Sequence, residues 1–342
     1  MAVKARVLCT SAQVKSAFEN TKDKWDMHRG NTQSVSEVYA QSHEHARRAK
    51  KLARCATVLR FEETVKLDRT GAIKMSMSSV DYCKDRHCPA CQWHKSRINT
   101  AKIFDRLPAV ENEFPNLRWL FLTLTVKNPV MRDLRETISD MNKAWGRLVK
   151  VKRWPAVGWL RSVEVTLGKD GNPHPHFHVM LAVKPQYFKD STYIKHDEWL
   201  AMWRNAMRDD SITQVDIRVV KSKADKKAGG GDLFAAVVET LKYSFKPSDV
   251  IDQPVFLFGL TEQLRGARFV ATGGVLAGIL AKDYEEPEES AAVAIAREGL
   301  IAANSDAWAI TDEDLELCDA APVQVPGVTL RWCTVERRYV DV

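Results

Sequence analysis

The sequence predicts an α+β protein with a small metal-binding module near its N-terminal end. Strand and helix signals alternate between residues 100 and 250, and cysteines cluster ahead of them. The 342 residues are 45% hydrophobic and 28% charged, which excludes a disordered or fibrous chain and leaves room for two or three domains.

The first hundred residues divide into two expected segments. Residues 1–54 form a basic helical segment, in which the run HEHARRAKKLAR (43–54) predicts one basic helix. Residues 55–99 form a zinc-binding module, with strands at 56–61 and 72–80 joined by a Thr-Gly turn. A core this small needs a bound metal to be stable.

Residues 100–250 form the expected catalytic domain. Apolar residues alternate in its strands and recur every three to four positions in its helices, and Pro247 ends the last helix. Strands are predicted at 119–126, 160–167, 177–183 and 213–220, and helices at 131–149, 194–208 and 233–245.

The remaining segments have a different composition. The run KSKADKKAGGGD (221–232) is typical of a flexible loop. Residues 251–282 are expected to extend the catalytic domain, and residues 283–342 to form a separate acidic segment with a final strand at 327–335.

Charge is distributed unevenly along the chain. Residues 251–342 carry 7 basic and 16 acidic side chains, which leaves 44 basic and 28 acidic in residues 1–250, a net charge of +16. This first part is where a polyanion such as DNA is expected to bind. An apolar run of membrane-spanning length and a signal peptide are both missing, so the expectation is a cytoplasmic protein with no membrane partner.

The spacing Cys83-x4-Cys88-x2-Cys91 predicts a zinc site, because a Cys-x2-Cys knuckle supplies two of the four ligands of a tetrahedral structural zinc. Cys55, across the predicted hairpin, completes the set, although His87 or His94 remains an alternative to it. The isolated Cys9, Cys318 and Cys333 are expected to be ordinary apolar residues. The basic neighbours that offset thiolate charge and face DNA phosphates are Arg86, Lys95 and Arg97, together with Lys84.

A histidine cluster predicts a second metal site. His176 and His178 are two apart in a strand and therefore point to one face. Glu164 on the preceding strand joins them only if the connecting loop holds an odd number of residues. Two imidazoles and a carboxylate suit Mg²⁺ or Mn²⁺, although the histidine pair alone would also accept Zn²⁺.

Tyr243 is the candidate nucleophile. Glu239 lies four residues before it on the predicted helix, where it can act as a general base, and Lys246 follows a turn later, where it can neutralise a phosphate. A tyrosine that attacks phosphorus needs these groups together with a metal.

These motifs, in this order, resemble those of rolling-circle plasmid replication initiators of the HUH endonuclease superfamily. The three motifs are FLTLT (121–125), PHFH (175–178) and the Glu239, Tyr243, Lys246 set. The Cys-Pro-x-Cys knuckle and the segment RGARF (265–269) are similar to those of the one-tyrosine bacterial plasmid branch, and the resemblance spans about residues 55–276.

The resemblance implies a central antiparallel sheet flanked by helices and attack by Tyr243 on one phosphodiester of the plasmid double-strand origin, cleaved as a single strand. The 5′ phosphate stays on the enzyme and the 3′ hydroxyl primes synthesis. Glu239 is implied to activate water at termination, and a host helicase and a replication polymerase are the implied partners.

Three alternatives remain open at this stage. An HUH transposase or relaxase would share the chemistry. The alternating histidines also fit a histidine-triad nucleotide hydrolase or transferase, which gives no role to Tyr243 or Glu239. A non-catalytic zinc-dependent nucleic-acid-binding regulator would form no covalent adduct with DNA.

Overall fold

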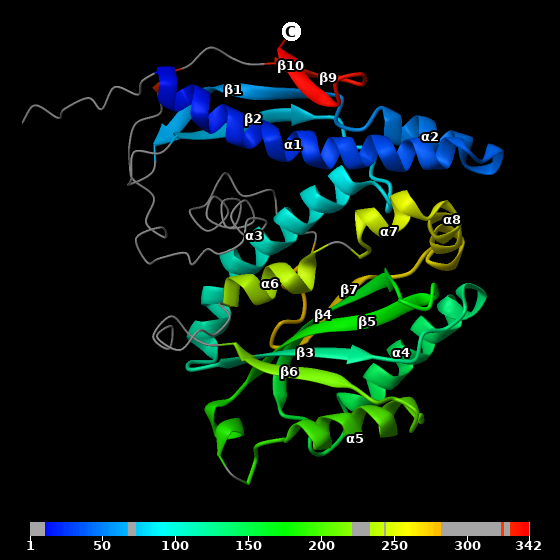
Figure 1. The fold of residues 1–342 in the computed structure, drawn as a ribbon. Helices are drawn as coiled ribbons and strands as arrows, with labels where there is room; N and C mark the ends of the chain where they lie inside the picture. The colour runs from blue at the N-terminus through cyan, green and yellow to red at the C-terminus, as the bar shows by residue number, and fades with distance from the viewer. Residues whose placement is uncertain are drawn as a thin grey trace, which may run out of the picture. The chain divides into compact units, whose positions relative to one another are not determined.

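The computed structural model describes residues 11–67, 73–189, 191–220, 233–242, 244–281, 323–324 and 329–341. It is an α+β protein, which confirms the fold class predicted from the sequence (Figure 1). The chain divides into two compact units, one containing residues 1–94 and 310–342 and the other residues 95–309. The loop expected at 221–232 and the acidic break at 283–290 lie outside the described residues.

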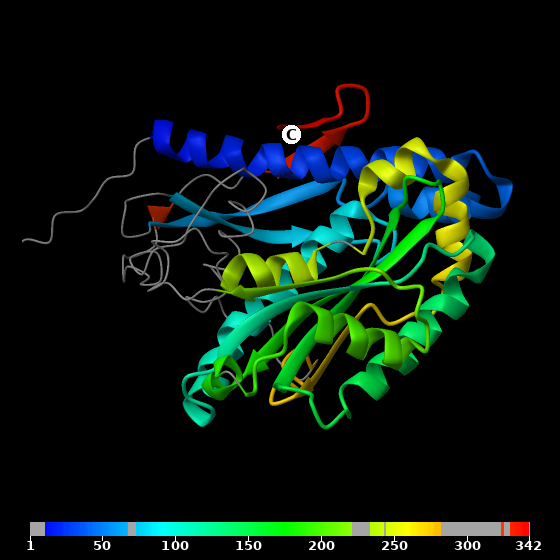
Figure 2. The ribbon, with the colours of Figure 1, turned by 60° about the horizontal axis from the view of Figure 1, so that its bottom comes forward.

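The first unit packs a long helix along an antiparallel sheet (Figure 2). The sheet has the order β10-β9-β1-β2, with the short β8 also paired to β1. The β1–β2 pair is the hairpin predicted from the sequence, and its turn lies outside the described part of the chain. The elements are α1 (Ser11–Ala40), η1 (His43–His45), α2 (Ala46–Ala53), β1 (Val58–Leu67), β2 (Ile73–Val80), β8 (Val323–Gln324), β9 (Thr329–Cys333) and β10 (Arg338–Asp341).

The C-terminal strands belong to this first unit. β9 pairs with β1, with Val58 opposite Arg331. Trp332 and Tyr339 are buried, and their rings meet edge to face at 5.2 Å. From the sequence, segment boundaries are expected after residues 54, 99 and 282. In the structure, the described parts of 1–54, 55–94 and 329–341 form one sheet and the helices that cover it. Pairing between strands so distant in sequence leaves no local signal.

The second unit is a five-stranded antiparallel sheet with the order β6-β3-β5-β4-β7. A central antiparallel sheet flanked by helices is therefore present, as the resemblance implied. Its strands are β3 (Arg118–Thr125), β4 (Ala156–Leu167), β5 (Pro173–Val183), β6 (Val215–Val220) and β7 (Val270–Gly274). Its helical elements are η2 (Met131–Asp133), α4 (Leu134–Leu148), η3 (Pro185–Phe188), α5 (His196–Met207), α6 (Leu233–Leu241), α7 (Pro247–Asp252) and α8 (Pro254–Gln263).

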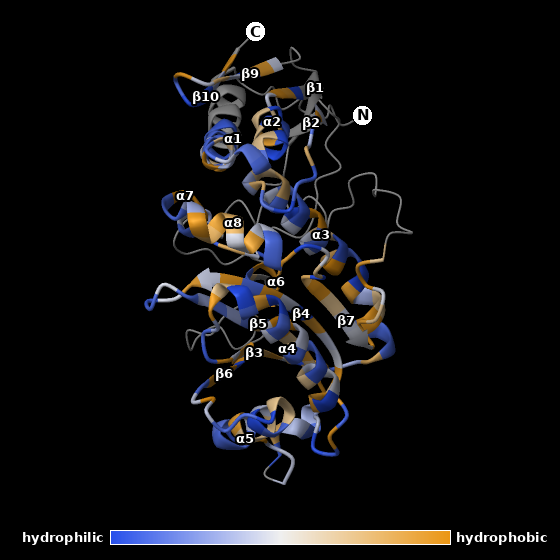
Figure 3. Cartoon of the chain, turned by 90° about the vertical axis from the view of Figure 1, so that its right-hand side faces the viewer, coloured by the Kyte–Doolittle hydropathy of each residue, from blue (hydrophilic) through white to orange (hydrophobic). Residues whose placement is uncertain are grey.

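Helices cover both faces of this sheet. α4 and α5 lie on one face and α6 on the other (Figure 1). Figure 3 colours most of α8 as apolar, and its buried residues are Phe256, Leu257 and Leu260. On the face beneath α6, the apolar side chains of Phe121, Leu160 and Met180 form a core. Further along the same strands this face becomes polar, and there the candidate site lies.

One long helix was not predicted. α3 (Pro89–Glu113) begins within the cysteine knuckle, contains Cys91 and Pro108, and is 25 residues long. The internal proline and the scattered charges hide its period in the sequence, because proline normally ends a helix. Within the described chain, no helix is both long enough and apolar enough to cross a membrane.

Candidate functional site

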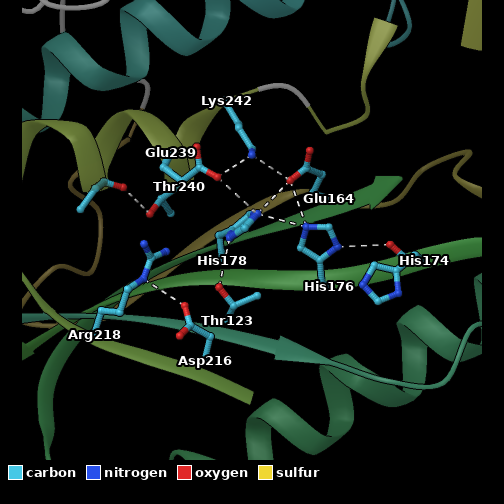
Figure 4. A network of polar contacts seen from close by, with 11 residues as sticks. Thr123, Glu164, His174, His176, His178, Asp216, Arg218, Glu239, Thr240 and Lys242 are labelled. Atoms are coloured by element: carbon cyan, nitrogen blue, oxygen red, sulfur yellow. Dashed lines mark hydrogen bonds and ion pairs between the residues drawn. The ribbon is translucent and has the colours of Figure 1, made fainter. Parts of the chain in front are cut away.

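Strand β5 carries the histidine pair to the α6 side of the sheet (Figure 4). His176 and His178 are 8% and 7% exposed, while Phe177 and Val179, between and beyond them, are fully buried on the opposite face. The alternation follows from the period of two in a strand. The buried apolar neighbours fix β5 in the sheet, so the imidazoles project from a rigid element.

Glu164 lies directly opposite His176 on β4. The β4–β5 loop holds five residues, 168–172, an odd number that meets the condition set by the sequence. Glu164 is 3% exposed, and its Oε2 atom lies 3.0 Å from Nε2 of His176 and 2.8 Å from Nε2 of His178. The three side chains therefore converge on one small volume.

The Nδ1 atoms of His176 and His178 contact groups outside the cluster, and these contacts orient the two imidazole rings. Nδ1 of His176 lies 3.2 Å from the His174 carbonyl oxygen, which only accepts, so Nδ1 can donate to it while Nε2 faces Glu164 and His178. Nδ1 of His178 lies 3.5 Å from the Thr123 hydroxyl, which can donate or accept, so this contact orients the ring without fixing its tautomer.

This donor set fits a divalent metal ion. The two Nε2 atoms are 3.1 Å apart, and each lies within 3.0 Å of Glu164 Oε2, so one cation could contact all three atoms. With the carboxylate oxygen they form three nitrogen and oxygen ligands, and such a set with open positions suits Mg²⁺ or Mn²⁺.

The end of α6 adds a carboxylate and an ammonium group. Glu239 Oε1 lies 4.0 Å from His178 Nε2, and Lys242 Nζ forms an ion pair with Glu239 and lies 3.4 Å from Glu164 Oε2 (Figure 4). Burial alone lowers the pKa of Lys242, but the two carboxylates outweigh it and raise that pKa. Burial also raises the pKa of Glu164, and the two histidines and Lys242 reverse this, so its pKa lies below the usual range.

The helix predicted to run to residue 245 ends at Leu241. The chain leaves the helix because the Ser244 carbonyl accepts a hydrogen bond from the Val165 amide of β4, and Pro247 then begins α7. Lys246 is exposed and precedes Pro247 in an extended conformation, so a shared helix face with Glu239 is ruled out. Tyr243 lies outside the described residues.

Sequence reasoning missed Lys242 and Thr123. Lys242 directly precedes the candidate tyrosine, so the pair Lys-Tyr was the available signal, but the assumed helix directed attention to position 246. Thr123 lies in the FLTLT motif, and only the pairing of β3 with β5, which sets Thr123 opposite His178, reveals its contact.

The four predicted cysteines also converge. The Sγ atom of Cys55 lies 3.5 Å from those of Cys88 and Cys91, and Cys83 Sγ lies 3.6 Å from Cys91 Sγ. Tetrahedral zinc with Zn–S bonds of about 2.3 Å separates its sulfurs by about 3.8 Å, so the set fits zinc. Hydrogen bonds from the other three thiols lower the pKa of Cys91, which favours a thiolate there.

The alternative ligands for the zinc site lie elsewhere. Nδ1 of His87 lies 3.3 Å from an Arg48 guanidinium nitrogen, and burial lowers the pKa of His87 to about 3. His94 stacks on Tyr82 at a ring distance of 4.0 Å. The compact thiol group therefore contains all four cysteines and neither histidine.

The expected phosphate-binding residues differ in exposure. Lys95 is exposed, whereas Arg86 and Arg97 are partly buried. Burial lowers the pKa of Arg86.

A family model described as "Replication protein" matches residues 74–309. The chain is 34% identical to "Protein rep" of Lentilactobacillus hilgardii over 238 residues, covering 67% of this chain and 73% of that protein. It is 33% identical to "Protein rep" of Lactiplantibacillus plantarum over 243 residues, with coverage of 67% and 73%. "Protein rep" of Bacillus amyloliquefaciens is 33% identical over 250 residues, with coverage of 68% and 72%.

The chain therefore belongs to the replication protein family. This confirms the resemblance to rolling-circle replication initiators that the ordered motifs indicated. No solved structure is significantly similar to the chain.

Proposed function

We propose that this protein initiates rolling-circle replication of a plasmid as an HUH endonuclease, nicking one strand of the double-strand origin. The observation that carries the proposal is the convergence of Glu164, His176 and His178 on one volume beneath Glu239 and Lys242. Membership in the replication protein family supports DNA as the substrate.

The three converging side chains would hold Mg²⁺ or Mn²⁺. Such an ion, when bound, polarises a phosphate oxygen and stabilises the charge that develops on it. The contacts of His174 and Thr123 orient the two imidazoles for this task, because they hold the Nδ1 side of each ring and leave Nε2 facing the ligand position.

Tyr243 is the proposed nucleophile. Its phenolate oxygen attacks the scissile phosphorus, the bond from phosphorus to the 3′ oxygen breaks, and the 5′ phosphate remains joined to the tyrosine. The phenolic proton passes to a base, and the released 3′ hydroxyl is the primer for synthesis. Lys242 and Lys246, on either side of Tyr243, would supply positive charge to the phosphate.

Glu239 is proposed to act in a later step. Its Oε1 atom lies 4.0 Å from His178 Nε2, close enough to the ligand group for a water molecule to reach a phosphate bound there. Glu239 would take a proton from that water at termination, which is general base catalysis. The first cleavage by Tyr243 does not require it.

The remaining expectations complete the proposal. Zinc held by the four cysteines would stabilise the first unit, and Arg86, Lys95 and Arg97 would contact DNA phosphates. A host helicase and a replication polymerase would act on the nicked origin.

The decisive experiment is incubation of the protein with single-stranded origin DNA and Mn²⁺, followed by mapping of the linked peptide. We expect an adduct at Tyr243, its loss in Tyr243→Phe, and its loss when His176 and His178 are both replaced by Ala. Glu239→Ala should still form the adduct, and in a replication reaction its product strands should run past one plasmid length into multimers. Unchanged cleavage by Tyr243→Phe would refute the assignment of the nucleophile.

A further inference from the structure

Helix α2 of the first unit presents one face that consists of cations. Three of the cations lie in α2 and the fourth is the residue that caps it, and at 3.6 residues per turn all four fall within about 100° of one another around the helix axis. They are Arg47, Lys50, Lys51 and Arg54. The opposite side buries Ala49 and Leu52 in the core of the unit. The amphipathic pattern therefore fixes the direction in which the cations point.

These four cations differ from their neighbour Arg48. Arg48 contacts Tyr39, Asp85 and His87, and its role is structural. By contrast, no carboxylate in the described part of the chain lies within ion-pair distance of the four. Exposed cations gathered without partners are typical of a surface that binds a polyanion.

The four cations line an open hollow of about 430 Å³. The other wall is the segment after β2, where Asp81 is the single acidic residue and Tyr82 the single aromatic one. The Cys55 and Cys83 side chains also line the hollow, so the zinc module fixes its shape. Apart from the charge of the cysteine site, its lining carries four positive side chains and one negative side chain.

We propose that this hollow of the first unit binds the phosphate backbone of duplex DNA. The stripe from Arg47 to Arg54 spans seven helical rises, about 10.5 Å. Over that length one strand of DNA presents about three phosphates. The proposal rests on the proposed function only in taking DNA as the partner.

Duplex DNA fits better than a single strand. Proteins that hold single strands use exposed aromatic faces on which bases stack. In the hollow, Tyr82 is the single aromatic residue, and its ring stacks on His94 and lies 6.3 Å from the ring of Trp25. Four cations with one aromatic ring among them are typical of contact with a duplex backbone, whereas stacking of successive bases needs several aromatic faces.

The test measures binding of the full-length protein to a 30-base-pair duplex of arbitrary sequence by fluorescence anisotropy, as NaCl is varied. In the double variant Lys50→Gln/Lys51→Gln, the slope of log Kd against log salt should decrease by about 1.8, and Kd should rise about tenfold. The second variant, Arg47→Gln/Arg54→Gln, should behave alike. The matched control, Lys150→Gln/Lys152→Gln, removes the same charge from exposed positions of the other unit and should leave the slope unchanged.

Three results would overturn the proposal. The first is an unchanged salt slope in both hollow variants, and the second is an equal decrease of the slope in the control variant. The third is loss of zinc by the hollow variants, which would mean that these cations serve to offset the thiolate charge. Adduct formation with single-stranded origin DNA is measured in parallel. Failure of that reaction in the wild type would refute the nicking function while leaving the salt comparison valid.

Discussion

Replacing Lys242 by Met should tighten metal binding while it weakens cleavage. The ammonium lies 3.4 Å from Glu164 Oε2, the oxygen that also faces both histidines, so a divalent cation at that position must share the carboxylate with it. A unit charge and a divalent cation 4 Å apart repel each other by about 2 kcal/mol in water and about 8 kcal/mol at the effective dielectric of a protein surface.

The magnitude follows from the exposure of the side chain. Lys242 is 32% exposed, so solvent screens much of the repulsion, and the water limit of ~2 kcal/mol is the value expected. This corresponds to a ~30-fold lower Kd for Mn²⁺. Cleavage at saturating Mn²⁺ should fall about 100-fold, because a charge that stabilises the reacting phosphate is lost.

Isothermal titration calorimetry with Mn²⁺ and DNA-free protein measures the first effect, and single-turnover cleavage measures the second. Lys246→Met is the matched control, because Lys246 is exposed and contacts none of Glu164, Glu239 and the two histidines. The Mn²⁺ affinity of this variant should equal that of the wild type. If Lys242→Met binds Mn²⁺ as weakly as the wild type or more weakly, the lysine holds Glu164 in place instead of opposing the metal.

Two further predictions concern stability. Cys91→Ser should lose zinc, and its first unit should unfold more readily. Cys333 lies outside the group of four thiols, so Cys333→Ser should keep its zinc. Equal zinc contents of the two variants, measured by atomic absorption, would contradict the site. Asn142→Ala should lower the free energy of unfolding in urea by about 2 kcal/mol, because it removes the acceptor 2.6 Å from the Arg161 guanidinium, which is 6% exposed. Arg161→Met should lower the free energy of unfolding by less than Asn142→Ala does, because it removes the buried charge itself.

The sequence predicted four of the five strands of the catalytic sheet and missed β7; the central strands β3, β4 and β5 were recognisable because they are runs of mostly buried residues. It placed strands at 160–167 and 177–183, and these pair as β4 and β5 with Glu164 opposite His176. It did not predict that β9 would pair with β1 or that α3 would run through Pro108. Both depend on tertiary contacts between segments with no local signal.

The candidate site was predictable where its residues lie on one strand or in one knuckle. His176 and His178 follow from the period of two, and the four cysteines follow from their spacing. Lys242 was not predictable, because its position depends on where α6 ends. That end is set by the hydrogen bond between Val165 and Ser244, which joins the chain after the helix to β4.

The final prediction concerns Thr123. Its hydroxyl lies 3.5 Å from Nδ1 of His178, and Thr123→Val keeps the shape while removing that contact. A histidine ligand that loses its outer partner binds metal about tenfold more weakly. Thr125→Val is the control, because the Thr125 hydroxyl donates to the Gln214 carbonyl instead of to a ligand. Calorimetry should therefore show weaker Mn²⁺ binding for Thr123→Val alone, and equal affinities in the two variants would mean that the protein core, not Thr123, orients His178.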